Sequence, residues 1–461
     1  MELNEREKNG LKVFVGSEYN IRVGESANST EKLDFTKPDK IRMLFPTSSS
    51  IKKEVEIIEQ NRIGLPTPLK YLGKTQIMGD MGDIVTPNGT AWYSDMAYGG
   101  TVKSLENNQA FISIEAEGKY DMNITRDEAS QKITQIDFVI NDNEEITKSI
   151  TVSENITVAE FIKEVNSIKD DNNEQMFLAI LHIGEGTEIL NFEGNYESYK
   201  CSIREFFRAG VLSESYKKKV APYLNFIIPR RGEARYFNML ISNRRNVGSY
   251  QYYGCRFLSL NLQYANNALT QLTANIWGGY VDDFDGLPSQ AEVDDTATAF
   301  AQTNGRTKAY CSRQRATAIA SMTNNFAWTV EPQWNISNEP YEIPLAKYTD
   351  SYDFEMMFNE QAKNIFEKYV TEGKNISVLL DTSTHKGGKE YKIIKSSKTL
   401  LGQPQYPALA DGVIQLSASG FTSIASISDP YTSLIIVTSD KQFDITYTEE
   451  QIKEDFPAYL E

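Results

Sequence analysis

The sequence predicts a mainly β protein with short helices, an α+β chain that folds as more than one domain. Alternation of apolar and polar residues with a period of two runs through many segments, as half-buried strands require. Stripes of helical period are few and short. A chain of 461 residues, 40% of them hydrophobic, is too long for one ordinary core and can bury several.

Charge, hydropathy and cysteine content narrow the classes of protein to which the chain can belong. The net charge of -16 argues against ordinary nucleic-acid binding, which needs clustered Lys and Arg to neutralise phosphates. No apolar run reaches the roughly 18 residues of a membrane helix, and residues 1–10 lack the apolar core of a signal peptide. Cys201, Cys255 and Cys311 form no CxxC pair, so we expect buried thiols in a reducing interior and no membrane contact.

Residues that could carry catalysis or hold a metal are few. The two histidines, His182 and His385, fall on a strand and in a turn, and no HExxH or GxSxG motif is present. Residues 73–75 are not a phosphate loop, because Pro68 stands where that motif needs glycine. In residues 281–292 several acidic residues have the spacing of a calcium-binding loop, but Val281, which cannot bind a metal, takes the first ligand position. We therefore expect no catalytic residues, no metal site, no cofactor and no enzymatic activity.

The first third of the chain alternates strands with one short helix. Residues 1–37 are polar and read as an extended arm. Residues 71–86 have stretches of period two and lead into a short helix that two glycines, Gly99 and Gly100, close at its C-terminus.

Residues 117–222 have a different character and predict a small ββαββ unit. Residues 134–153 read as a hairpin, and two further strands are expected around Gly184–Gly186. Between them Thr157 and Glu160 form a capping box for an amphipathic helix. Its apolar stripe is Val158, Phe161, Ile162, Val165 and Ile168. The unit looks inserted, because the strand pattern of its flanks resumes at residues 223–242.

A long hairpin at residues 255–279 is polar on one face without carrying charge there. Leu258, Leu260 and Leu262 on the first strand, with Leu272, Ala274 and Ile276 on the second, form its apolar face. Its polar face consists of Ser259, Asn261, Gln263, Gln271, Thr273 and Asn275.

The pattern of strand, helix and glycine then repeats in the second half. After an acidic and polar loop, a strand at residues 351–359 is followed by a helix that ends at Gly373 and by a hairpin with a Gly-Gly turn. The last strand, residues 411–424, again has an uncharged polar face, made of Gln415, Ser417 and Ser419. The sequence therefore predicts a duplication of pattern, without sequence identity.

Some charged residues are candidates for contacts between subunits. Arg230 with Arg231 and Arg244 with Arg245 form two Arg-Arg pairs, and no aromatic residues interleave with them as a nucleic-acid platform requires. Salt bridges to a second copy of this acidic chain explain these arginines better. Asp353 and Glu355 alternate along a strand and could face such a partner.

The order of these elements resembles the tail tube (major tail) proteins of long-tailed bacteriophages, in the version with two tandem tube domains. The passages that carry the resemblance are residues 79–100, 252–279, 326–336, 351–380 and 411–424. Each is weak alone, and their order carries the resemblance, which spans about residues 36–116 and 223–438. Residues 117–222 depart from it and are similar to a small hook-type module of flagellin-like proteins.

The resemblance implies two tandem β-sandwich/barrel domains of the tail-tube type and a small inserted ββαββ domain that decorates the tube. The predicted organisation is an N-terminal arm (1–37), a first tube domain (38–116 and 223–280), the insert (117–222), a long acidic and polar loop (281–318), a second tube domain (319–440) and an acidic C-terminal tail (441–461).

The implied function is that of a structural virion protein, assembled in the host cytoplasm, whose rings stack into the phage tail tube. The partners would be other copies of the chain, as a trimer with pseudo-sixfold rings or a hexamer, and other tail proteins. DNA would pass through the lumen without specific contacts, and the uncharged polar residues would line it, since lysines there would bind phosphates. The alternatives are a tail-tip hub or distal tail protein that forms a single ring, and a secreted surface adhesin.

Overall fold

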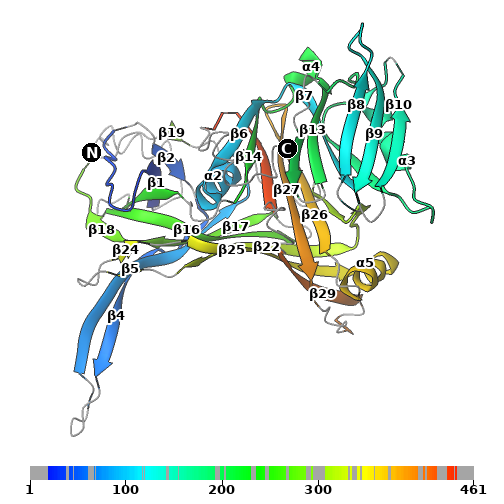
Figure 1. The fold of residues 1–461 in the computed structure, drawn as a ribbon. Coiled ribbons are helices and arrows are strands. Elements are labelled where there is room, and N and C mark those ends of the chain that lie inside the picture. Colours follow the sequence, from blue (N-terminus) through cyan, green and yellow to red (C-terminus); the bar gives the residue numbers. More distant parts are fainter. Residues whose placement is uncertain are drawn as a thin grey trace.

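The computed structural model describes residues 19–443 except 38–40, 45, 61–66, 68, 117, 119, 142–144, 154, 193–197, 202–203, 230–234, 244–248, 266–268, 287–291, 294–306, 331–332, 335–339, 343–344, 358, 372–374, 403–408, 411–412, 423–432 and 441. Over the described residues the protein is mainly β, with large antiparallel sheets and short helices (Figure 1). The predicted fold class is confirmed at this level.

The first layer, which we call the long sheet, runs through both halves of the chain. Its antiparallel strands follow one another in the order β5–β17–β16–β22–β25–β29. Their bounds are β5 Leu69–Ile84, β16 Tyr250–Ala265, β17 Gln271–Gly278, β22 Ile319–Val330, β25 Leu345–Met357 and β29 Val413–Thr422. The halves join where β16 pairs with β22, so the predicted hairpin at residues 255–279 lies inside a wider sheet.

The middle sheet also joins the two halves and is buried on both faces. Its order is β6–β14–β30–β27–β26–β20. Its strands are β6 Thr101–Glu106, β14 Tyr223–Ile227, β20 Thr307–Cys311, β26 Asn375–Lys386, β27 Lys389–Leu401 and β30 Ser433–Ser439. On β30, Ile435 and Val437 join the core shared with the long sheet, whereas Leu434 and Ile436 join a second core. A continuous apolar run suits such a strand.

The second core lies between the middle sheet and the outer sheet, whose order is β11–β7–β13–β12. The outer sheet consists of β7 Gln109–Ala116, β11 Phe177–Ile183, β12 Ser198–Cys201 and β13 Arg204–Val211. A three-stranded sheet, β8 Tyr120–Arg126, β9 Ile133–Asn141 and β10 Glu145–Thr151, stands beyond it at the right of Figure 1. Because β7 precedes the predicted insert and pairs with β11 and β13, the insert is tied closely to the body of the protein.

The helix predicted in the insert is confirmed, and one of its predicted strands is not. α3, Val158–Ser167, begins with the predicted capping box of Thr157 and Glu160 and buries Val158, Phe161 and Val165. Between Gly186 and Phe192 the described residues form no second strand, and Ile189 makes only an isolated bridge to Thr157. The backbone there bonds to two different segments and so pairs with neither as a strand. Leu190 N–H donates to the Ile156 carbonyl, and Asn191 N–H donates to the Ala209 carbonyl.

The other helices lie beside the middle sheet or at its edge. α2, Pro87–Tyr98, starts at Thr86, whose hydroxyl accepts a hydrogen bond from Gly89 N–H, and ends at Gly99 in the left-handed region (φ 104°), as predicted. It packs between β16 and β30 and supplies Trp92, whose ring lies 5.6 Å from that of Phe257. α4 spans Glu214–Lys217, and α5 spans Glu360–Thr371.

The remaining strands lie around these sheets. They are β1 Tyr19–Ser26, β2 Ile41–Leu44, β3 Ser48–Ser49, β4 Lys52–Gln60, β15 Tyr236–Asn243, β18 Tyr280–Asp283, β19 Glu292–Val293, β21 Gln314–Arg315, β23 Gln333–Trp334, β24 Pro340–Glu342 and β28 Leu409–Ala410. Of these, β23 and β24 form a two-stranded sheet of their own. The predicted Gly-Gly turn joins β26 to β27, with both glycines at positive φ (Gly387 55°, Gly388 83°).

Candidate functional site

The polar residues that the sequence analysis assigned to an inner wall share one face of the long sheet, here called the polar face. One row crosses five strands directly, from Gln271 to Gln263, Thr323, Asp353 and Ser419. Residues of the same parity on each strand lie on the same side as this row. The register therefore puts the described residues of the prediction on this face: Ser259, Asn261, Gln263, Gln271, Thr273, Asn275, Ser417 and Ser419. The side chain of Gln415 lies outside the described part, so its side stays a prediction.

The opposite face of the long sheet is apolar and buried. Leu260, Leu262 and Leu272 pack in one core with residues of both halves. Leu258 is only half-buried, because the pairing of β16 with β17 shifts between Phe257 and Ser259. The two-faced character predicted from alternation is confirmed, while the assignment of the polar face to a lumen stays a prediction.

Neighbouring strands add acidic residues to the polar face. The strands singled out from the sequence are uncharged there, but Asp80 on β5 and Asp353 and Glu355 on β25 lie on the same side, all exposed. Asp353 and Glu355, the candidates for contacts between subunits, thus share a face with the lumen candidates.

Hydrogen bonds across the strands hold these polar groups in place. Asn275 donates to the Asp80 carboxylate at 2.8 Å, at one side of the face. Near the centre Asn261 donates to the Asn325 amide oxygen, and Asn325 donates in turn to Asp353 at 3.3 Å. Ser419 donates to the second oxygen of Asp353 at 2.7 Å. These hydrogen bonds therefore fix the orientation of the polar side chains across neighbouring strands.

A hairpin of β4 and the first part of β5 projects from the body, at the lower left of Figure 1. Ile57 lies opposite Leu72 and Ile58 lies opposite Tyr71, so both faces of the hairpin carry apolar side chains. Leu72 is 78% exposed and Ile57 is 56% exposed. The projecting hairpin therefore carries an exposed apolar surface, which is a candidate contact surface.

The arginine and cysteine predictions have different outcomes. Arg230, Arg231, Arg244 and Arg245 lie outside the described residues, so their roles stay predictions. Cys255 and Cys311 are free, buried thiols, as expected, and burial raises the pKa of both.

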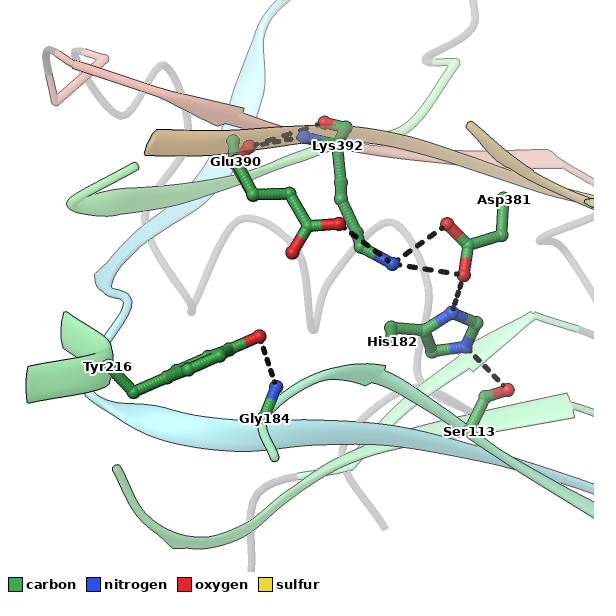
Figure 2. A network of polar contacts seen from close by, with 8 residues as sticks. Ser113, His182, Gly184, Tyr216, Asp381, Glu390 and Lys392 are labelled. Carbon is green, nitrogen blue, oxygen red and sulfur yellow. Dashed lines mark hydrogen bonds and ion pairs between the residues drawn. The ribbon is translucent and has the colours of Figure 1, made fainter. Parts of the chain in front are cut away.

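A buried polar network that the sequence did not predict joins the outer and middle sheets (Figure 2). His182 Nδ1 lies 2.8 Å from Asp381 Oδ2, and His182 Nε2 lies 2.8 Å from Ser113 Oγ. The order hydroxyl, imidazole and carboxylate is that of a nucleophile, base and orienting acid. Ser113 is, however, 0% exposed, so a substrate cannot reach its hydroxyl in this conformation.

The sequence held a usable signal for this network. His182 stands within a run of apolar residues and Asp381 directly follows one, and each residue falls within a strand. A charged or polar residue in such a run is buried and needs a partner, although the sequence does not say which one.

The comparisons with known proteins add no family. No protein-family model matches the chain, and no curated protein matches it. Within the described ranges, no group of three or more His, Cys, Asp or Glu side chains is arranged to hold a metal ion. Likewise, no helix of the described part is long and apolar enough to cross a membrane.

Proposed function

We propose that the chain is a structural protein that assembles into rings, and that the rings stack into the tail tube of a long-tailed bacteriophage. The observation that carries the proposal is the polar face, which extends over strands of both halves. A sheet that is apolar on the side of its own core and polar on the other can form the wall of a hollow assembly. Copies of the long sheet around an axis would close its edges into a barrel.

The strand pairings support two tandem tube domains. In the first half β4 pairs with β5, β5 with β17, β17 with β16, and β6 with β14. In the second half β22 pairs with β25, β25 with β29, β29 with β28, and β26 with β27. Each half also places a helix, α2 or α5, after the corresponding strand β5 or β25. The predicted insert, residues 117–222, then lies in the connection between β6 and β14, where the second half has only the short Gly387–Gly388 turn between β26 and β27.

The chemistry of the polar face suits a conduit for DNA. Amides and hydroxyls offer no fixed positive charge to phosphates, and Asp80, Asp353 and Glu355 repel them. The ladder of hydrogen bonds keeps these groups oriented along the wall. With two tube domains in each chain, a trimer gives a ring of pseudo-sixfold symmetry.

The projecting β4–β5 hairpin favours a protein whose rings stack over one that forms a single ring. Its exposed apolar side chains, led by Leu72, need a partner beyond the chain. A tail-tip hub or distal tail protein would form one ring and stop. An adhesin would remain monomeric at the same concentrations.

Negative-stain electron microscopy of the purified chain tests the assembly. We expect rings, and stacked tubes at raised concentration or with a tail initiator complex. Isolated rings under every condition would favour the hub, and monomers alone would contradict the proposal.

Lysines on the polar face should turn a passive wall into a DNA-binding one. We expect Gln263→Lys with Gln271→Lys to leave folding nearly unchanged, because both side chains are exposed and surface substitutions shift stability by about 0.5 kcal/mol or less. Assembled tubes of this variant should retain DNA in a filter-binding assay at low salt and release it as salt rises.

The matched control places the same charge on the insert. Thr147→Lys with Ser149→Lys lies on the exposed side of β10, away from the polar face. If the control tubes retained DNA as strongly as the Gln263/Gln271 variant, the retention would reflect net charge and not a lining of the lumen.

A further inference from the structure

Four residues join the outer sheet to the middle sheet, and we call them the His182 clamp: Ser113, His182, Asp381 and Lys392. Ser113 on β7 and His182 on β11 belong to the outer sheet, whereas Asp381 on β26 and Lys392 on β27 belong to the middle sheet. Lys392 Nζ lies 3.3 Å from Asp381 Oδ1 and 3.4 Å from Asp381 Oδ2. With the two imidazole contacts, the clamp forms one continuous chain of polar contacts (Figure 2).

Aromatic side chains seal the clamp from solvent. The His182 side chain is 0% exposed and that of Asp381 is 3% exposed. The ring of Phe111 lies 6.2 Å from the imidazole, and the ring of Phe206 lies 5.9 Å from it, measured between centroids. At this depth an unbalanced charge costs far more than it does at the surface.

The charged groups around His182 balance one another only while its imidazole is neutral. Lys392 pairs with Asp381 on one side. On the other side Arg204 pairs with Glu115 on β7, and its Nη1 lies 3.4 Å from Ser113 Oγ. A proton on His182 would add a third buried cation to two matched ion pairs.

The remaining titratable groups nearby do not supply the missing negative charge. Lys308 on β20 adds further repulsion to a protonated His182. Glu390 on β27 reaches Lys392 at 3.9 Å, on the side away from the imidazole in Figure 2. Tyr216 on α4 is occupied as the acceptor of the Gly184 N–H at 3.2 Å.

We propose that the His182 clamp holds the outer sheet on the middle sheet while His182 is neutral, and that acid loosens this contact. In the neutral state His182 Nδ1–H donates to Asp381 and Nε2 accepts from the Ser113 hydroxyl. Protonation removes that acceptor and places a positive charge between Lys392 and Arg204. The clamp thereby makes the attachment of the insert sensitive to pH.

The pH window follows from the two titrating members of the clamp. Burial lowers the pKa of His182 below its usual 6.5, although Asp381 opposes this shift. The stability that His182 contributes is therefore complete above pH 6.5 and decreases as pH falls below it. Burial alone would raise the pKa of Asp381, but Lys392 and His182 lower it to about 2, so its contribution is lost only below its unfolded value of 3.8.

Urea unfolding of the wild-type chain and of His182→Gln, repeated between pH 7.5 and 5, tests the proposal. His182 alone should raise the wild-type unfolding constant by up to about tenfold per pH unit below pH 6.5, equivalent to one proton taken up on unfolding. The glutamine variant should lack this one-proton component. The chain offers a matched control in His385→Gln, because His385 is the second of its two histidines and is exposed. This control should keep the wild-type slope.

Hydrogen exchange and a direct titration locate the effect. At pH 5.5 the amides of β11 and β26 should exchange at least tenfold faster than at pH 7.5 after correction for intrinsic rates, while those of β16 and β17 keep their protection. If the glutamine variant does not fold, NMR of ¹³C-labelled histidine in the wild-type protein takes its place. Equal proton uptake by wild type and His182→Gln, or a His182 that titrates at or above its usual 6.5 in the folded protein, would overturn the proposal.

Discussion

Replacing Lys395 by methionine is expected to lower the free energy of unfolding by about 3–5 kcal/mol. The Lys395 ammonium lies 3.1 Å from Asp350 Oδ1, with the two side chains 1% and 0% exposed. It also donates to Tyr98 Oη at 3.1 Å and to the Asn324 amide oxygen. Methionine fills similar space but removes the cation that balances a fully buried carboxylate. The midpoint and slope of a urea unfolding curve measure the loss.

Two further variants separate this effect from the loss of packing. Lys395→Met combined with Asp350→Asn removes both charges and should recover much of the stability, since a neutral pair carries no buried charge to compensate. Lys70→Met removes an ion pair to Glu59 whose partners are 62% and 49% exposed, and should change stability by about 0.5 kcal/mol or less. A double variant no more stable than Lys395→Met would show that shape, and not charge, fixes this site.

The position of Lys395 explains why it matters to the whole chain. Lys395 is on β27 of the second half, while Tyr98 ends α2 of the first half. Trp328 adds a second tie, donating from its indole N–H to the Ala97 carbonyl at 2.7 Å. These contacts fix the long sheet, α2 and the middle sheet to one another, so the halves are expected to unfold together.

Local patterns in the sequence predict the polar face well. Alternation places Gln263 and Gln271 on one side and Leu262 and Leu272 on the other, because successive side chains on a strand point in opposite directions. The same rule gives the side of Ser417 and Ser419. It needs no knowledge of which strands are neighbours, and this is why the predicted residues share a face.

Contacts between distant segments could not be predicted in the same way. Asp353 lies on the polar face beside Ser419, 66 residues away, only because β25 pairs with β29. His182 meets Ser113 across 69 residues and Asp381 across 199. Alternation fixes the face of each residue but not its partner, and the partner decides whether a polar side chain is exposed, paired or buried.

Removing two apolar side chains from the projecting hairpin is expected to abolish stacking. Ile57→Ser with Leu72→Ser changes a cross-strand pair in which both side chains are exposed. In a contact between rings each would contribute about 1.5–3 kcal/mol when buried, so the double variant weakens that contact by roughly a hundredfold or more. Negative-stain microscopy should show rings without tubes. The stability of the single chain should change little, because the hairpin extends away from the core.

The control removes apolar side chains of similar exposure from the insert. Ile189→Ser with Val211→Ser alters positions that are 57% and 52% exposed, and tubes of this variant should form as in the wild type. Were both double variants to stop stacking, the loss would reflect general surface hydrophobicity. Were the hairpin variant to form normal tubes, the hairpin would have no part in ring contacts, and the tube proposal would depend on the polar face alone. The result therefore decides which of the two exposed surfaces, polar or apolar, specifies the assembly.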